Sequence, residues 1–538
     1  MRELDDLGTR FWAWRASQQP RTRDDIPRLD RPPGWLPEVD SRLAERRGEE
    51  LAVFRAELDR IRPPAGEVPD QVDRRLLHSA IARVTWESDI LRVRSVPRYW
   101  TDQALGPVFD ALLRPGVDDA RIAEVIRLLR AVPGTLAHAP AALAGAAREF
   151  ARLALAELGD AGARLGECAA ALAALCPAGR GADLWSAARD AASALDDFAR
   201  WLAAALPGLP PAVPVGPEHY QWFLREVACV PLPISEIEAV GRREYDRAVW
   251  LELVHRNRAT HVPEPPLPAS AAEQCRAEDT AEAQVRAFYE REDLLSQPGH
   301  LGRYLALPMP AYLEPLRFLG VADELTGPGR LTENGVAYVP VPGPGLPYFY
   351  AANARDPRAG IIHEGVHYQQ LALSWGNPRP LRRHYYDSGA NEGIAFYNEE
   401  LMLAAGLLDD APHTKTAVCN FMRLRALRVT VDVGLATGAL TIESAAAELA
   451  DRVPMDTATA AEEAAFFAET PGQALTYQIG KTQLVSLLAD AARTRGDRLD
   501  LRRLHDDIWV NGNVPIALLR WELLGLTDEL AAIGVADG

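Results

Sequence analysis

Apolar side chains recur every three or four residues along most of the chain, a spacing typical of helices that bury one face. The pattern is densest at 118–206, where Ala and Leu alternate with charged residues, and it indicates an antiparallel array of helices there. Proline-rich stretches at 206–215 and 262–268 interrupt it; the first cannot be helical, and the second is a further connection. We therefore predict a mainly α-helical protein in which an N-terminal helical region, 1–206, and a second region, 207–538, form one continuous body.

A different pattern occupies residues 303–351, where glycine and proline pairs separate short runs of apolar residues. Two of these runs, 336–339 and 348–350, are typical of strands, so we expect a small β-sheet in a helical protein. We expect this sheet to lie beside the helix that carries the metal motif described below. Its edge strand can pair with an extended peptide, which makes Tyr348 a candidate substrate-binding residue. A purely structural sheet is the alternative.

Composition and charge limit the partners and the compartment. The 538 residues carry a net charge of −17, which disfavours binding to nucleic acid. The five cysteines are scattered without a C-x-x-C pair, as reduced thiols of a cytosolic protein are. The acidic N-terminus lacks the apolar core of a signal peptide, and no apolar run reaches membrane-spanning length. We expect a cytoplasmic protein with neither a nucleic-acid nor a membrane partner.

The candidate chemistry centres on an H-E-x-x-H motif, His363-Glu364-Gly365-Val366-His367. Histidines four residues apart lie on one side of a helix, so His363 and His367 can hold the same zinc ion. Glu364 is offset from that direction and can reach a water on the metal as a general base. The alternative is an ordinary buried histidine pair. The surrounding apolar stripe disfavours it, because two buried histidines and a glutamate are costly to desolvate without a metal.

A zinc site of this kind needs a third protein ligand, and Glu392 is the best candidate. Gly376 and Pro378 are stop signals for the first helix, and a second helix carrying Glu392 can then run back alongside it. Glu399 follows two turns later on nearly the same face. It is either a partner that orients a ligand or the third ligand itself.

Several segments, taken in order, resemble a large bacterial group of domain-of-unknown-function proteins related to zinc peptidases. Besides the H-E-x-x-H helix, the similar segments are Tyr220-Gln221-Trp222-Phe223-Leu224-Arg225, Glu392-Gly393-Ile394-Ala395-Phe396-Tyr397, 471–480 and 505–515. The resemblance implies a mainly helical, gluzincin-like fold with a deep cleft, and zinc held by His363, His367 and Glu392. Members of that group often carry a longer H-E-x-x-P-G-H motif. The shorter motif here is the ordinary peptidase spacing and indicates a divergent branch.

Three further residues are candidates for contacts with a substrate. The position of Tyr477 in its family-like segment makes it a candidate donor to the oxyanion that forms during amide hydrolysis, and a tyrosine that only packs on its helix is the alternative. His505 and Lys481 are candidates for binding a substrate carboxylate. A solvent-facing histidine beside two aspartates is the alternative for His505.

These features predict a zinc-dependent hydrolase that cleaves amide or peptide bonds of short peptides, with Glu364 as the general base. One alternative is a tailoring enzyme that uses the same zinc site on a specialised small metabolite, by hydrolysis or elimination. A non-catalytic binding protein is a third possibility. The intact metal motif, which includes a candidate base, argues against it. Two histidines and a glutamate also accept other divalent metals. The bond cleaved, endo or exo action, and the oligomeric state stay open.

Overall fold

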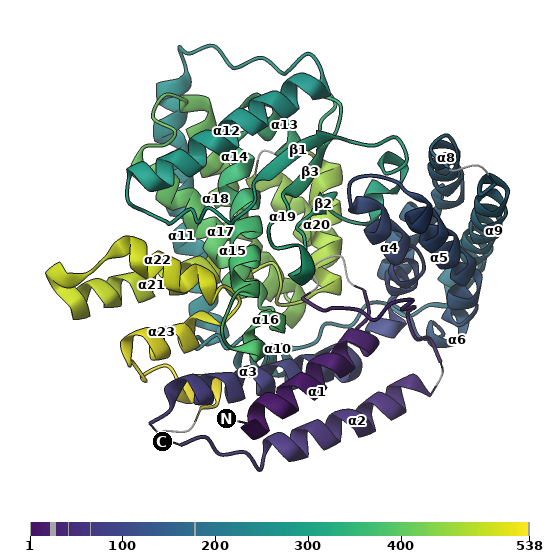
Figure 1. The fold of residues 1–538 in the computed structure, drawn as a ribbon, viewed down its shortest axis with the longest axis horizontal. Coiled ribbons are helices and arrows are strands. Elements are labelled where there is room, and N and C mark those ends of the chain that lie inside the picture. The colour runs from purple at the N-terminus through teal and green to yellow at the C-terminus, as the bar shows by residue number, and fades with distance from the viewer. Residues whose placement is uncertain are drawn as a thin grey trace.

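The structure is a computed structural model that describes residues 2–21, 28–40, 42–64, 66–176, 179–453 and 455–535. Helices dominate these residues, as the apolar periodicity predicts, and a three-stranded sheet accompanies them (Figure 1). No helix in this described part is long and apolar enough to cross a membrane.

The first three helices line the lower edge of the molecule in Figure 1 and share the core of the metal-site helices. Phe11, Leu76, Ile362 and Ile394 are buried in one continuous cluster, although the first two lie about 300 residues before the others in the chain. The helices are α1 (Arg2–Gln18), α2 (Leu43–Leu58) and α3 (Val68–Thr85).

The next six helices form a lobe with a second core, seen on the right of Figure 1. Ala and Leu from these helices fill that core, and Val336 and Tyr338 of the sheet join them. The sheet therefore lies against this lobe. The helices are α4 (Pro97–Leu113), α5 (Asp119–Ala137), α6 (Ala139–Ala142), α7 (Arg148–Leu158), α8 (Ala161–Ala173) and α9 (Gly181–Ala205).

Both proline-rich stretches fall between helices, as predicted. The expectation that 206–215 contains no helix is wrong for Leu206–Gly208, which form a single 3-10 turn, because proline is tolerated in the first turn of a helix. Residues 209–216 contain neither helix nor strand, and 263–268 lie in the loop between α11 and α12. The helices that follow these breaks are α10 (Pro217–Glu226), α11 (Ile234–Ala259) and α12 (Ala271–Arg291).

The sheet has the strand order β1-β3-β2, with β1 parallel and β2 antiparallel to β3. Its strands are β1 (Tyr304–Pro308), β2 (Asp323–Glu324) and β3 (Gly335–Val339), so the strand predicted at 336–339 is confirmed. The ring of Tyr304 in β1 stacks on Tyr368 of the metal-motif helix, with centroids 6.2 Å apart. This contact places the sheet beside that helix.

The strand predicted at 348–350 is wrong, because these residues begin helix α13 (Tyr348–Arg355). A short aromatic run has no periodicity that separates a strand from a helical turn. Tertiary packing favours the helix here, since Phe349 packs against Phe421 with ring centroids 5.2 Å apart.

The rest of the chain builds the body around the metal motif. It comprises α14 (Arg358–Gly360), a π-helical turn (Ile361–Gly365), α15 (Val366–Trp375), α16 (Pro380–His384), α17 (Ser388–Ala405), α18 (Pro412–Thr437), α19 (Ile442–Arg452), α20 (Thr457–Glu469), α21 (Thr476–Arg495), α22 (Leu501–Val510) and α23 (Ile516–Leu524).

Candidate metal centre

The H-E-x-x-H motif spans a junction between two kinds of helix. His363 and Glu364 lie in the π-helical turn, and His367 lies in the first turn of α15. A π-helical turn interrupts the normal ladder of backbone hydrogen bonds. The side chain of Asn398 in α17 compensates, because its Nδ2 donates to the carbonyl of Ile362 at 2.7 Å. One helix thus braces the backbone that carries the first histidine.

Helix α17 runs beside this segment and supplies Glu392. Its start is fixed by Asp387, whose carboxylate accepts a hydrogen bond from the amide of Ala390. Its position is fixed by a close crossing with α21, where a Cβ built on Gly480 would lie 2.0 Å from the carbonyl oxygen of Gly389. Helix α15 ends at Trp375 with Gly376 as its C-cap, as the stop signals predict, and α17 follows later in the chain and runs beside it.

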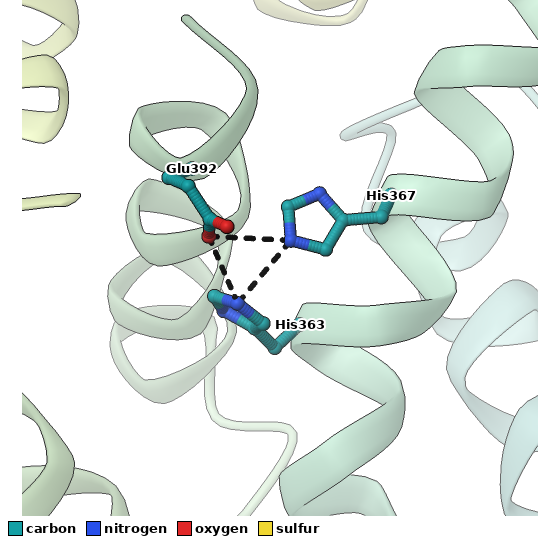
Figure 2. Close-up of side chains that lie close together, drawn as sticks. All are labelled: His363, His367 and Glu392. Atoms are coloured by element: carbon teal, nitrogen blue, oxygen red, sulfur yellow. Dashed lines mark hydrogen bonds and ion pairs between the residues drawn. The ribbon is translucent and has the colours of Figure 1, made fainter. Parts of the chain in front are cut away.

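Three ligand atoms converge between the two helices, as Figure 2 shows. The Nε2 atoms of His363 and His367 are 3.3 Å apart. The Oε2 of Glu392 lies 3.3 Å from each of them. The three candidate ligand atoms therefore form a nearly equilateral triangle. The side chains of the two histidines are buried.

The spacing of this triangle fits a small metal ion. Zinc bonds of about 2.0–2.1 Å at tetrahedral angles separate ligand atoms by about 3.3–3.4 Å. The Oε2 of Glu392 is buried and has no hydrogen-bond partner among the described residues, although two imidazoles face it. The lone pairs of two imidazole nitrogens and a carboxylate oxygen at this distance repel one another unless a proton or a metal cation lies between them. The residues thus fit a metal ion of this size and preference.

The charges around the triangle also favour a cation. Burial raises the pKa of Glu392, but the two histidines outweigh that effect and hold its pKa well below the ordinary range. Burial and Arg425 act to lower the pKa of His363. The carboxylates of Glu392 and Glu399 outweigh them and raise this pKa to about 9. The carboxylates dominate the site, so positive charge at its centre is stabilised.

Glu399 lies on the outer side of His363. Its Oε1 is 2.7 Å from Nδ1 of that ring, which directs Nε2 toward Glu392. Arg425 of α18 holds Glu399 in turn, with Nη2 2.9 Å from Oε1 and Nη1 donating to Oε2 at 3.0 Å. The structure therefore places Glu392 in the triangle and Glu399 behind it.

Glu364 is half-buried and lies near an acidic group of the sheet. Burial and then the negative charge of Glu364 raise the pKa of Asp323 in β2 to about 7. The hydroxyl of Tyr304 donates to Asp323 at 2.5 Å. A Cβ built on Gly365 would touch the ring of Tyr304 at 3.8 Å, so strand β1 packs directly against the motif.

Tyr477 of α21 lies beside His363. Its ring stacks on His363 with centroids 6.2 Å apart and planes 12° apart. The guanidinium groups of Arg425 and Arg428 lie 5.5 and 5.0 Å from the centroid of the same ring. The Tyr477 ring thus lies close to an imidazole and to two guanidinium groups.

The other three candidate residues for substrate contacts are His505, Lys481 and Tyr348. His505 is fully buried, and its ring nitrogens contact the carbonyl of Leu294 at 2.7 Å and the hydroxyl of Tyr397 at 2.9 Å. Lys481 is buried between Glu244 and Glu400, at 3.1 and 2.9 Å. Both groups are thus engaged within the protein. Tyr348 begins α13, and its side chain lies outside the described part of the structure.

Two residues at the site were not found from the sequence. Arg425 acts through Glu399, and Asp323 lies near Glu364 from a strand of only two residues. The sequence signal for Arg425 is weak: it is one of three arginines inside the apolar pattern of 417–436, where a buried charge needs a partner. Nothing in the sequence around 323 indicates a role for Asp323.

Comparison with known proteins gives a family and a fold. Residues 33–523 match the family described as "Bacterial protein of unknown function (DUF885)". Two solved structures are similar along the whole chain. A "putative lipoprotein of unknown function" from Shewanella oneidensis is 15% identical with a TM-score of 0.67, over 97% of this chain and 98% of that one. A "putative lipoprotein" from Colwellia psychrerythraea is 16% identical with a TM-score of 0.66, over 96% of each. No curated protein matches the chain.

Proposed function

This chain belongs to the bacterial family of unknown function DUF885, and from its metal centre we propose that it is a zinc-dependent hydrolase that cleaves amide bonds of short peptides. The observation that carries the proposal is the triangle of His363 Nε2, His367 Nε2 and Glu392 Oε2, with sides of 3.3 Å. The relationship to gluzincin peptidases, the deep cleft and the identity of the metal as zinc are parts of the same proposal.

His363, His367 and Glu392 would hold the metal. A bound zinc ion supplies Lewis acidity, which makes water more acidic and polarises a carbonyl group. Glu399 keeps the Nδ1 proton on His363, so that Nε2 presents its lone pair to the centre of the triangle. Arg425 neutralises Glu399, which allows that carboxylate to stay ionised while buried.

Glu364 moves the proton. Its carboxylate takes a proton from the attacking water and then delivers it to the leaving amine. It follows His363 directly in the chain, yet its side chain is half-buried rather than buried as the histidines are. That exposure supports a group that meets both water and substrate.

Tyr477 acts on the carbonyl side. Its hydroxyl donates a hydrogen bond to the oxygen that gains negative charge as the carbonyl carbon becomes tetrahedral. The stacking of its ring on His363 supports this role, because it holds the ring at the metal centre before substrate binds. The guanidinium groups of Arg425 and Arg428, which are paired with Glu399 and Glu463, pack near the same ring and help to hold it in place.

The test is elemental analysis of the purified chain beside the His363→Ala variant, followed by mass spectrometry of a mixture of short peptides after incubation with each protein. We expect about one zinc ion per chain and cleaved peptides from the wild type, with both lost in the variant. No bound metal after zinc is added back would overturn the proposal. Bound zinc without cleavage of any peptide would favour a tailoring enzyme that acts on a specialised metabolite.

A further inference from the structure

A cavity of about 310 Å³ lies outside the metal centre, among α11, α13, α18 and the proline-rich loop 262–268. None of His363, His367 and Glu392 lines it. Its volume falls at the lower end of the range in which proteins bind small organic molecules, about 300–1,000 Å³.

Much of the cavity wall is apolar. It is formed by Ala351 and Ala352 of α13, Ala359 of α14, Ala417 and Phe421 of α18, and Pro265 of the loop. Alanine side chains leave the space open, and Phe421 offers a flat face against which an aliphatic chain or a ring can pack. The cavity therefore suits a ligand with an apolar body.

Two buried donors on this wall lack hydrogen-bond partners within the described residues. Asn420 is 7% exposed, and its Nδ2 donates a hydrogen bond to no atom of the described residues. The Nε of Arg355 is also buried without a hydrogen bond. It lies 3.2 Å from Oε1 of Glu264, out of hydrogen-bonding alignment. A buried donor without a partner is costly, so both atoms call for an acceptor.

The carboxylates of the wall do not supply that acceptor. The Oε2 of Glu252 is already bound by Arg423 at 3.1 Å. The side chain of Glu264 is 62% exposed, so its pairing with Arg355 is weak and easily displaced. A ligand carboxylate can take the place of Glu264 on the guanidinium, because two oxygens in a plane match the fork of an arginine.

We propose that this cavity is a binding site for a small monocarboxylic acid with an apolar body, whose carboxylate is held by Arg355 and Asn420 and whose body packs on Phe421 and the alanines. The proposal does not depend on the function proposed for the metal centre. Because a carboxylate can also bind a metal, the two sites have to be separated by experiment.

The test is isothermal titration calorimetry with 3-phenylpropanoate, compared with its neutral amide, 3-phenylpropanamide, and with 3-phenylpropan-1-amine, which has no acceptor. Titrations use the wild type and the His363→Ala variant. We expect saturable binding of the carboxylate to both proteins, weaker binding of the amide and none of the amine. Absence of binding to the wild type would overturn the proposal, and so would binding that disappears in His363→Ala, because the metal centre would then be the site.

Two variants test the residues and two matched variants control for general effects. Arg355→Gln and Asn420→Leu should each weaken binding of 3-phenylpropanoate by about tenfold, the usual loss for a hydrogen bond to a charged group. Arg256→Gln and Asn257→Leu change the same residue types at exposed positions of α11 and should leave it unchanged. Unchanged affinity in both cavity variants, with circular dichroism showing that they are folded, would place the carboxylate elsewhere and reject the site.

Discussion

Glu399 and His363 form a buried pair in which Oε1 of the carboxylate lies 2.7 Å from Nδ1 of the imidazole. The pair orients the imidazole, so that Nε2 of His363 faces Glu392 at 3.3 Å. Glu392 and Glu399 are two turns apart on α17, so one helix supplies both a proposed metal ligand and the group that orients His363. This arrangement makes the metal centre sensitive to changes that do not touch the metal.

We predict that Glu399→Gln weakens zinc binding by about 10–100-fold, the usual effect of losing a carboxylate behind a metal-binding histidine. Zinc affinity is measured by competition with a chelator. Glu400→Gln is the matched control, because Glu400 faces Arg247 and Lys481 instead of His363. Equal affinity in wild type and Glu399→Gln would show that Arg425 and the backbone alone orient the imidazole.

Glu364→Gln should keep the zinc content of the wild type and lower kcat for peptide cleavage by at least about 100-fold. The amide retains the size of the carboxylate but cannot accept a proton, and general-base catalysis contributes about 10²–10⁴-fold. Elemental analysis and steady-state kinetics on one preparation give both quantities. Retained turnover would remove Glu364 as the base.

Tyr477→Phe removes only a hydroxyl, and we expect kcat to fall by about 10²–10³-fold, as for other oxyanion donors. KM and zinc content should stay close to those of the wild type, since the ring still stacks on His363. A change in KM with no change in kcat would instead indicate that the hydroxyl binds substrate in its ground state.

The crossing of α17 and α21 predicts a strong steric effect at Gly480. A Cβ there would lie 2.0 Å from the carbonyl of Gly389 and 2.9 Å from the Cα of Gly393, next to the ligand Glu392. Gly480→Ala should therefore lower the free energy of unfolding by about 1–3 kcal/mol and weaken zinc binding. Gly166→Ala in α8 is the control, because a Cβ there meets no atom within 4 Å. Its unfolding midpoint should stay the same or rise, since alanine favours helix.

Acid stability should depend on the carboxylate of Glu400. Burial raises the pKa of Glu400, but Lys481 and Arg247 outweigh it and lower that pKa to about 2. Because the folded-state pKa lies below the ordinary value of 4.5, the ionised group stabilises the fold above pH 4.5, and that stabilisation is lost as the pH falls toward 2. The difference in urea-unfolding midpoint between wild type and Glu400→Gln should therefore shrink over this range. The control Glu167→Gln, at an exposed position in the middle of α8, should show no such trend.

The helical character, the small sheet and the histidine pair follow from local pattern. Apolar spacing predicted helices on both sides of the two proline-rich breaks, and glycine–proline punctuation predicted the strand at 336–339. The i, i+4 spacing puts His363 and His367 on the same side of a helix, because the direction of each Cα–Cβ bond follows from the backbone. The run 348–350 was assigned wrongly, since its helical state depends on the contact of Phe349 with Phe421, a residue far away in the sequence.

The sequence by itself determined the chemistry available at the centre of this protein: two imidazoles one turn apart, an adjacent carboxylate and a second helix bearing two more. Only the tertiary structure decided which of the carboxylates lies with the two histidine nitrogens and which lies behind His363. The crossing of α17 and α21 fixes the position of the helix that carries Glu392, and Glu392 lies in the triangle. Arg425 of α18 holds Glu399 behind His363. The same packing buries His505 and Lys481 among partners of their own. The physical reason is that hydrogen bonds and charges act over a few ångströms in space, whereas a sequence pattern reports only neighbours along the helix.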